Sequence, residues 1–252
     1  MNHWTLVVSV AGVILASKLS AVAPLVSGDV PTADAGRFEW YVGSLFGKND
    51  GTISRELPLM ELVYGLSDRQ EITFEIPWLS ERGVHGWEDA VVGTKYMFVK
   101  ETKTLPGISG SLEVKLPSAS TSRGLGTGEF DYGLLLRAQK TWGRLTLLGN
   151  VDYTFVGELG AENVWFLSFA QFYELAKRTS LLSEVYFETS EESRTSERLA
   201  ANIGVEHELA DHFKIHAAIG TSLRGHQQGG PDLRAYIGFK WEFDAPLHRA
   251  IN

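Results

Sequence analysis

The feature that most constrains this chain is a two-residue alternation of apolar and polar or small side chains that recurs along most of its length. The clearest example lies near the C-terminus, where the apolar positions are Leu233, Ala235, Ile237, Phe239, Trp241 and Phe243. Successive side chains of a β-strand point to opposite faces, so this period predicts a strand with one apolar and one polar face. Its length is unusual for a soluble protein and close to the roughly 9 to 11 tilted residues that cross a bilayer.

The same period recurs in other parts of the chain, including residues 71–78, 111–116, 145–153, 198–205 and 213–220. Breaks in the pattern divide the chain into about twelve candidate strands. We expect them to start near Arg37, Glu56, Arg69, Trp87, Gly107, Gly128, Arg144, Asn163, Arg178, Glu197, His212 and Pro231. An even number of amphipathic strands of this length predicts an all-β fold, a transmembrane antiparallel up-and-down β-barrel.

The predicted connections alternate between brief turns and wider polar loops. Brief turns are expected at residues 67–69, 141–143, 177–178 and 211–212. Wider loops are expected at residues 47–55, 80–86, 117–127, 188–196 and 222–230. Short turns on the periplasmic side and longer loops outside are typical of outer-membrane barrels, so the alternation favours that location.

The first 23 residues have the features of a secretion signal. Residues 5–16 are apolar, which is the right length for a signal-peptide core and too short to cross a bilayer. Ala21-Val22-Ala23 provides an A-x-A cleavage pattern that would leave Pro24 as the first mature residue. The segment before the apolar core lacks Lys and Arg, and proline is unfavourable after a cleavage site, so an uncleaved apolar segment is the alternative.

These features divide the chain into four parts. Residues 1–23 are expected to be the signal peptide and residues 24–36 an irregular lead-in rich in Pro, Asp and Gly. The β-barrel is expected to span residues 37–243, followed by a C-terminal tail at residues 244–252.

Composition excludes several classes of protein. After the first two dozen residues, no apolar run approaches the roughly 18 residues of a spanning helix, which excludes a helical membrane bundle. The 26 glycines, 13 Phe, 8 Tyr and 7 Trp suit strands joined by tight turns. The absence of cysteine excludes disulfides, thiol nucleophiles and thiolate metal sites. The net charge of −8 argues against a nucleic-acid partner.

The period alone does not decide which face of the strands is inside. A soluble lipocalin-like barrel would point the apolar residues inward, and a β-sandwich would bury them between two sheets. The signal-like start, the long strands, the asymmetric connections and the aromatic final strand together favour the membrane barrel. We therefore expect the bacterial outer membrane as the location, with lipid and the barrel-assembly machinery as partners, the latter through the final strand.

Several short motifs resemble a family of Gram-negative outer-membrane barrels named for the meta-pathway of phenol degradation. They are Pro24-Leu25-Val26, Arg37-Phe38-Glu39, Glu56-Leu57-Pro58-Leu59, residues 64–69, residues 93–96, Lys115-Leu116-Pro117, residues 124–128, Asp131-Tyr132-Gly133 and Gly238 with Phe239, Trp241 and Phe243. Their order extends over residues 24–243. The resemblance implies a transporter or channel whose solutes include aromatic compounds. The chain differs from a typical barrel end in that residues 244–252 continue past the last aromatic residue.

The polar face of the strands carries many ionisable side chains. The acidic ones include Glu39, Glu71, Glu75, Glu113, Asp131, Asp152, Glu184, Glu206 and Glu242, and the basic ones include Arg37, Lys95, Lys115, Arg137, Arg198, Lys214, Arg224, Arg234 and Lys240. In one interpretation they pair across a narrow barrel and fill it, since an unpaired buried charge is costly. In the other they line a polar conduit that selects a solute. The residues that we expect to line the lumen are Glu39, Glu75, Lys95, Glu113, Lys115, Asp131, Arg137, Asp152, Arg198, Lys214, Arg234 and Lys240.

No motif for catalysis, metal binding or cofactor binding accompanies these charges. The glycine string at residues 124–128 lacks the helix and the Lys-Ser/Thr of a phosphate-binding loop. The seven histidines show no H-E-x-x-H or paired metal spacing, and no G-x-S-x-G elbow occurs. We therefore expect no enzyme activity, no metal and no cofactor, and passive passage of small solutes. A barrel enzyme acting on lipids and a closed structural barrel remain as alternatives.

Overall fold

The computed structural model describes residues 24–49, 51–191, 197–224 and 232–245. Within these ranges the chain forms strands and one short 3-10 helix, η1 (Thr121–Arg123). The strands are β1 (Arg37–Asn49), β2 (Thr52–Ser67), β3 (Gln70–Glu81), β4 (Val84–Trp87), β5 (Val91–Val99), β6 (Gly107–Lys115), β7 (Asp131–Trp142), β8 (Leu145–Phe155), β9 (Val164–Ala176), β10 (Thr179–Glu188), β11 (Arg198–Ala210), β12 (Phe213–Arg224) and β13 (Leu233–Asp244). The expected signal peptide and residues 246–252 of the expected tail lie outside the described residues.

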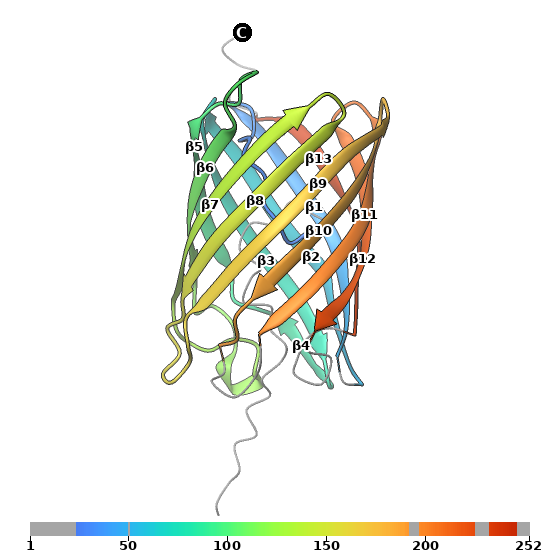
Figure 1. The fold of residues 1–252 in the computed structure, drawn as a ribbon. Coiled ribbons are helices and arrows are strands. Elements are labelled where there is room, and N and C mark those ends of the chain that lie inside the picture. Colours follow the sequence, from blue (N-terminus) through green and yellow to red (C-terminus); the bar gives the residue numbers. More distant parts are fainter. Residues whose placement is uncertain (1–23, 50, 192–196, 225–231, 246–252) are drawn as a thin grey trace, which may run out of the picture.

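The strands form one antiparallel sheet that closes into a barrel (Figure 1). Consecutive strands pair along the chain, except that β3 pairs with both β4 and β5. β1 pairs with β13 over nearly its whole length, which joins the first strand to the last. The expected up-and-down barrel of twelve strands is confirmed, with β4 as one short additional strand. Among the described residues, no helix is long and apolar enough to cross a membrane.

The expected fourth barrel strand is present as β5, but it begins at Val91 and not near Trp87, which ends the short additional strand β4. The chain forms β4 as a short hairpin with the end of β3, leaves the sheet at residues 88–90, and returns as β5 beside the start of β3. Glu88 and Asp89 are buried in this break, where an oxygen of Asp89 accepts a hydrogen bond from the backbone N of Ala119 at 2.7 Å. The alternation did not reveal this break because both flanking segments are themselves strands.

The wide loops expected at residues 47–55 and 80–86 are also wrong. β1 and β2 continue to Asn49 and Thr52, and β3 and β4 flank a turn at Arg82 and Gly83. Beyond the bilayer both faces of a hairpin meet water, so polar residues continue a strand there without ending it. The long connections at residues 116–130 and 156–163 lie at this end, which is the extracellular end by the length rule for outer-membrane barrels.

The apolar residues of the alternating pattern point outward. Ile237 is 66% exposed, Leu112 57%, Leu136 53% and Ile203 52%, although each lies in the middle of a strand. Their neighbours along the strands, such as Tyr236, are buried inside the barrel. An outer band of exposed apolar residues around a closed barrel is the surface that contacts lipid, and it identifies an outer-membrane barrel.

A close contact inside the barrel supports the seam between β1 and β13. The ring of Tyr236 lies against the backbone of Gly43 on β1 and of Gly238 on β13, and a Cβ atom at either glycine would overlap it. Gly43 and Gly238 are themselves register partners across the seam. The two glycines therefore allow the ring to cover the junction of the first and last strands.

An arginine on the lipid face should destabilise the barrel in a depth-dependent way. Ile237→Arg, in the middle of β13, should lower the free energy of unfolding by about 2 to 4 kcal/mol, because it places a charge in hydrocarbon. The matched change Leu223→Arg, at the extracellular end of β12, should cost about 0 to 1 kcal/mol. Urea unfolding in lipid vesicles measures both, and equal stability of the two variants would show that the lipid face is assigned wrongly.

Candidate functional site: the barrel lumen and its luminal segment

The lumen is occupied by residues 24–35, which precede β1 and are called here the luminal segment. Leu25 is 1% exposed, Val26 6%, Val30 2% and Ala33 4%. These residues are buried although they lie outside the strands, because the barrel wall surrounds them. Figure 1 shows this segment, in dark blue, inside the ring of strands. The irregular lead-in expected from the sequence therefore runs through the middle of the barrel.

Apolar contacts fix the start of the luminal segment against one side of the wall. Leu25 packs with Leu148, Ala170 and Leu182, which lie on β8, β9 and β10. Val26 joins a second cluster with the residues Phe166, Tyr186 and Ala200. These inward apolar residues interrupt the otherwise polar inner face, because they contact the luminal segment and not water.

A single carboxylate holds the next turn of the segment. The two side-chain oxygens of Glu184, on β10, accept hydrogen bonds from the backbone N of Val26 at 2.8 Å and of Ser27 at 2.9 Å. The Ser27 hydroxyl also donates to Glu184 at 2.6 Å. Hydrogen bonds to a charged acceptor are the stronger ones, so Glu184 is the main polar anchor of the segment.

Other strands hold the rest of the segment through its backbone. Amide N–H groups of the segment donate to side-chain oxygens on β8, β7 and β3. The pairs are Gly28 N with Asn150 at 2.9 Å, Val30 N with Gln139 at 3.4 Å, and Ala33 N with Glu71 at 2.6 Å. The guanidinium of Arg234, on β13, donates to the carbonyl of Pro24 at 3.2 Å. The wall thus satisfies backbone groups that would otherwise be buried without partners.

Two lysines organise the charges near the end of the segment. The Lys95 amine lies 3.1 Å from Asp29 of the luminal segment and 3.0 Å from Glu71. The Lys240 amine lies 3.1 Å from Glu39 and 2.7 Å from Glu242. Each lysine is therefore held between two carboxylates, and the first of these clusters ties the luminal segment to β3 and β5.

A chamber of about 130 Å³ remains between the luminal segment and the wall formed by β1, β2, β3, β5 and β13. Its charged lining consists of Asp29, Glu39, Glu61, Glu71, Lys95 and Lys240. At roughly 30 Å³ for each water, this space holds about four water molecules or one small solute. Four carboxylic acids against two amines give the lining an acidic balance.

The twelve predicted lumen residues all belong to the inner face of the barrel. Six are buried, namely Glu75, Lys95, Glu113, Asp131, Arg137 and Arg234. The other six, which are Glu39, Lys115, Asp152, Arg198, Lys214 and Lys240, are partly buried. The structure brings together three pairs within this set: Glu39 with Lys240 at 3.1 Å, Lys115 with Asp131 at 2.5 Å, and Glu113 with Arg137 at 3.9 Å.

The remaining basic residues of the set contact groups outside it. Arg198 lies 3.2 Å from Glu188, and Lys214 lies 3.0 Å from Glu206. Lys95 and Arg234 contact the luminal segment, as described above. The charges of the inner face therefore pair with one another, as in the first interpretation, and they also surround a residual space, as in the second.

Sequence reasoning missed the partners that the luminal segment supplies. Asp29 and Ser27 were included only in an irregular lead-in, and Asn150 and Gln139 were not distinguished from other polar residues of the inner face. The run Leu25-Val26 and the later Val30 were the available signal. Apolar residues in a segment outside the strands need a surface to bury them, and the lumen is that surface.

The connection at residues 116–130, which carries η1, lies at the extracellular mouth of the barrel. Leu125 of this loop is 3% exposed and packs over Gly86 of β4, where any Cβ atom would overlap its side chain. Lys115, at the end of β6, donates a hydrogen bond to Thr127 at 3.1 Å as well as contacting Asp131. The loop is therefore held against the mouth by the same inner-face charges.

Carboxylic acids dominate the interior. Among the buried residues that the structure describes, ten are acidic, and the basic ones other than histidine are Lys95, Arg137 and Arg234. The acidic ones are Glu56, Glu71, Glu75, Glu81, Glu88, Asp89, Glu113, Asp131, Glu184 and Glu188. Carboxylic acids therefore outnumber basic side chains in the buried interior.

Comparison with known proteins gives one family and a set of similar barrels. A family model described as "Putative MetA-pathway of phenol degradation" matches residues 32–243. An outer membrane channel from Pseudomonas putida F1 has a similar structure, with a TM-score of 0.68 and 13% identity, covering 86% of this chain and 99% of that chain. No curated protein sequence gives a significant match.

Two porins also have similar structures. The NanC porin gives a TM-score of 0.60 at 8% identity, covering 80% of this chain and 98% of its own. The KdgM porin gives 0.57 at 13% identity, covering 81% of this chain and 99% of its own. At these identities the similarity shows the fold.

Loss of the Glu184 anchor should release the luminal segment without unfolding the barrel. In Glu184→Ala, the amides of Val26 and Ser27 should exchange hydrogen roughly tenfold faster or more, because each loses a charge-assisted hydrogen bond. Glu188→Ala removes a carboxylate on the same face of β10 that pairs with Arg198, and it serves as the matched control. Unchanged protection of both amides in Glu184→Ala would show that apolar packing alone holds the segment.

Proposed function

Because this chain belongs to the family of the MetA-pathway of phenol degradation, we propose that it is a passive outer-membrane channel for small solutes. The main support is the inner face of the barrel, which is mostly polar and charged apart from the apolar residues that contact the luminal segment. A charged lining inside a membrane barrel suits water and solutes and would be costly in a sealed interior. The similar barrels include a channel and two porins by name.

The luminal segment limits the size of the solute. It occupies the lumen through hydrogen bonds, ion pairs and apolar contacts, and it leaves the 130 Å³ chamber beside β1, β2 and β3. A space of this size admits ions and molecules of a few heavy atoms at a time. Larger solutes would pass only when the segment moves away from the wall, which requires breaking the contacts with Glu184, Asn150 and Glu71.

The charges of the lining set the preferred sign of the solute. The buried interior is rich in carboxylic acids, and the chamber has four of them against two amines. Fixed charges in a narrow pore attract counter-ions and exclude ions of the same sign. The channel should therefore favour small cations and neutral polar molecules. Since the family description refers to phenol degradation, neutral phenols should pass more readily than aromatic carboxylates.

The lipid-hydrolase alternative has less support. Catalysis of that kind needs a serine hydroxyl hydrogen-bonded to a histidine ring. The described hydrogen bonds of histidine rings instead join His207 to Thr179 and His212 to Arg37 and Glu242. His216, inside the barrel, contacts the rings of Tyr41 and Tyr236, and its Nδ1 atom lies 3.9 Å from the carboxylate of Glu206. The channel proposal needs no catalytic group.

Conductance across a planar bilayer should show directly how far the luminal segment restricts the lumen. The wild-type protein should give small discrete steps, and Glu184→Ala with Asn150→Ala should give steps at least about twofold larger, because the lumen widens when its backbone anchors are lost. Glu188→Ala should behave as the wild type does. An absence of steps in both proteins at every voltage, with lipid hydrolysis detected, would favour the enzyme instead.

Ion selectivity should follow the charge of the lining. Under a KCl gradient the wild-type reversal potential should indicate a preference for K⁺, and Glu61→Lys should move it toward zero or past it, because it adds a positive charge to the lining. Lys115→Glu at the mouth should strengthen the preference for K⁺. A reversal potential that favours Cl⁻ in the wild type, or that ignores these substitutions, would contradict the assigned pathway.

A further inference from the structure

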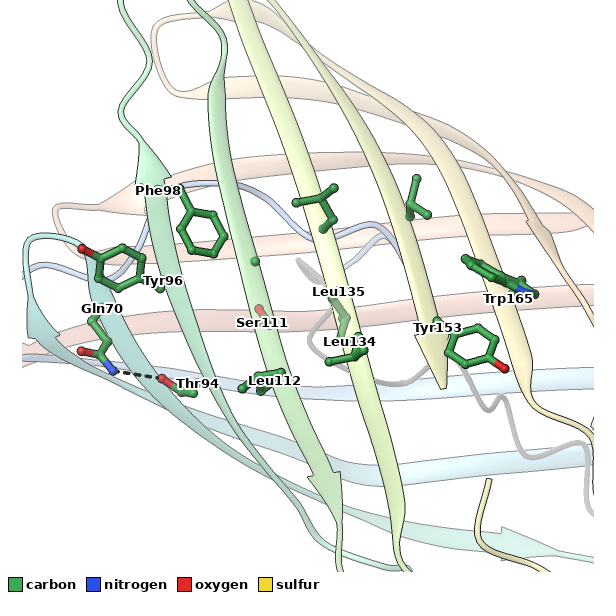
Figure 2. Close-up of a pocket in the computed structure, with 13 residues that line it drawn as sticks. Gln70, Thr94, Tyr96, Phe98, Ser111, Leu112, Leu134, Leu135, Tyr153 and Trp165 are labelled. Carbon is green, nitrogen blue, oxygen red and sulfur yellow. Dashed lines mark hydrogen bonds between the residues drawn. The ribbon is translucent and has the colours of Figure 1, made fainter. Parts of the chain in front are cut away.

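The lipid face carries a hollow that the channel function does not use. It lies over β5 to β9 and has a volume of about 610 Å³, several times that of the luminal chamber. Figure 2 shows Tyr96 and Phe98 at one end, Tyr153 and Trp165 at the other, and Leu112 and Leu134 between them. These side chains belong to the outward face, where Phe98 is 55% and Trp165 48% exposed.

The hollow follows the hydrogen-bonding direction of the sheet and crosses the strands. Thr94, Leu112, Leu134, Tyr153 and Trp165 are successive register partners on five adjacent strands. At about 4.8 Å between strands, this row is about 19 Å long. Since strands of such barrels tilt by about 35 to 45°, the row runs obliquely and rises by roughly 12 Å across the bilayer.

The hollow is deepest near Gly110, a residue that has no side chain. Gly110 faces outward on β6, in the row next to Leu112, between Tyr96 on β5 and Leu136 on β7. Gly110 has no side chain to project into the membrane, and the Phe98 ring lies so close beside it that a Cβ atom at this position would overlap the ring. Gly110 is the fourth residue of β6 from its periplasmic end, so the deepest part lies in the periplasmic half of the membrane.

The polar groups of the hollow gather at the same end. Gln70 begins β3 at the periplasmic turn, and its amide nitrogen donates to the Thr94 hydroxyl at 3.4 Å, drawn as the dashed line in Figure 2. The middle is formed by leucine and valine side chains, and none of the lining residues is Asp, Glu, Lys, Arg or His. The shape is thus a long apolar groove with uncharged hydrogen-bonding groups at its periplasmic end.

We propose that this groove binds one acyl chain of a phospholipid from the periplasmic leaflet. The groove is continuous with the apolar band that contacts lipid, so hydrocarbon already covers its rims. Its length of about 19 Å and its oblique course suit an extended chain that starts near Gln70 and ends near Trp165. The Gln70 amide, at the periplasmic turn, has a second N–H that is free to donate to an ester oxygen of such a lipid, whereas the Thr94 hydroxyl donates to the carbonyl of Glu71.

A bound acyl chain would supply dispersion contacts to the outward side chains that line the groove around Gly110. An empty hollow of this size would deprive the surrounding leucine and aromatic side chains of dispersion contacts on one side. Loosely packed bulk lipid supplies them only in part, whereas a chain held along the row supplies them to five strands at once. The site is therefore distinct from the lumen, and its occupancy does not depend on passage of solute.

Quenching of Trp165 by brominated phospholipids tests the proposal in the full-length protein. Trp165 is the second residue of β9 at its extracellular end, where a tryptophan without a bound chain meets head-group regions and is quenched best by bromine near the head group. A chain lying in the groove instead brings its methyl end to Trp165. Subtracting the spectrum of Trp165→Phe isolates this residue, and we expect bromine near the methyl end to quench it at least as strongly.

Filling the groove should abolish the signal from the methyl end. Gly110→Leu adds a side chain at the deepest point, and Val151→Phe fills the middle from β8 without crowding a glycine. Ala217→Phe, on the outward face of β12, enlarges the lipid face elsewhere and is the matched control, with quenching as in the wild type. Phospholipid that remains bound after detergent extraction, counted by native mass spectrometry, should fall in the first two variants and not in the control.

Two outcomes would overturn the proposal. Quenching of Trp165 by head-group bromine alone, identical in the wild type and in Val151→Phe, would show an ordinary lipid surface. Protection of Trp165 from every brominated lipid, together with a cross-linked dimer, would show that a second copy of the barrel covers the groove.

Discussion

The constraint on which the structure depends is that backbone polar groups within a bilayer must find partners in the protein itself. A sheet meets this requirement only when its last strand pairs with its first, and here β1 and β13 pair from Arg37 with Asp244 to Lys48 with Leu233. Closure gives the barrel an outer face, which must be apolar because it contacts lipid, and an inner face, which can be polar. The period of two that runs through the sequence is the consequence of this division.

Closure also creates the space that the luminal segment fills. A ring of twelve strands leaves an interior too wide for opposite side chains to fill in every layer, and the chain places its own residues 24–35 there. That segment has no regular secondary structure to satisfy its amides, so the wall supplies acceptors such as Glu184, Asn150 and Glu71. The same carboxylates that could select a solute therefore also position the segment that limits its size.

The two faces of the wall carry different kinds of site for the same reason. Inward positions are free to be charged because they meet water, the luminal segment or an opposite charge, as Lys95 does with Asp29 and Glu71. Outward positions meet hydrocarbon, so recognition there rests on shape, as in the groove over β5 to β9. The charged inner face and the lipid-facing surface are thus separated by the thickness of a single sheet.

The sequence by itself determined the barrel and its strand number and divided each strand into an apolar and a polar face, because a strand held between lipid and water must alternate at every residue from Leu233 to Phe243. It also pointed to the inward charges, including Lys95, Glu113 and Arg137, since their positions follow from the same period. Only the tertiary structure decided which charges meet, that β4 and β5 are separated at residues 88–90, and that the lead-in occupies the lumen. These depend on contacts between residues far apart in the chain, such as Ser27 with Glu184, and no local period records them.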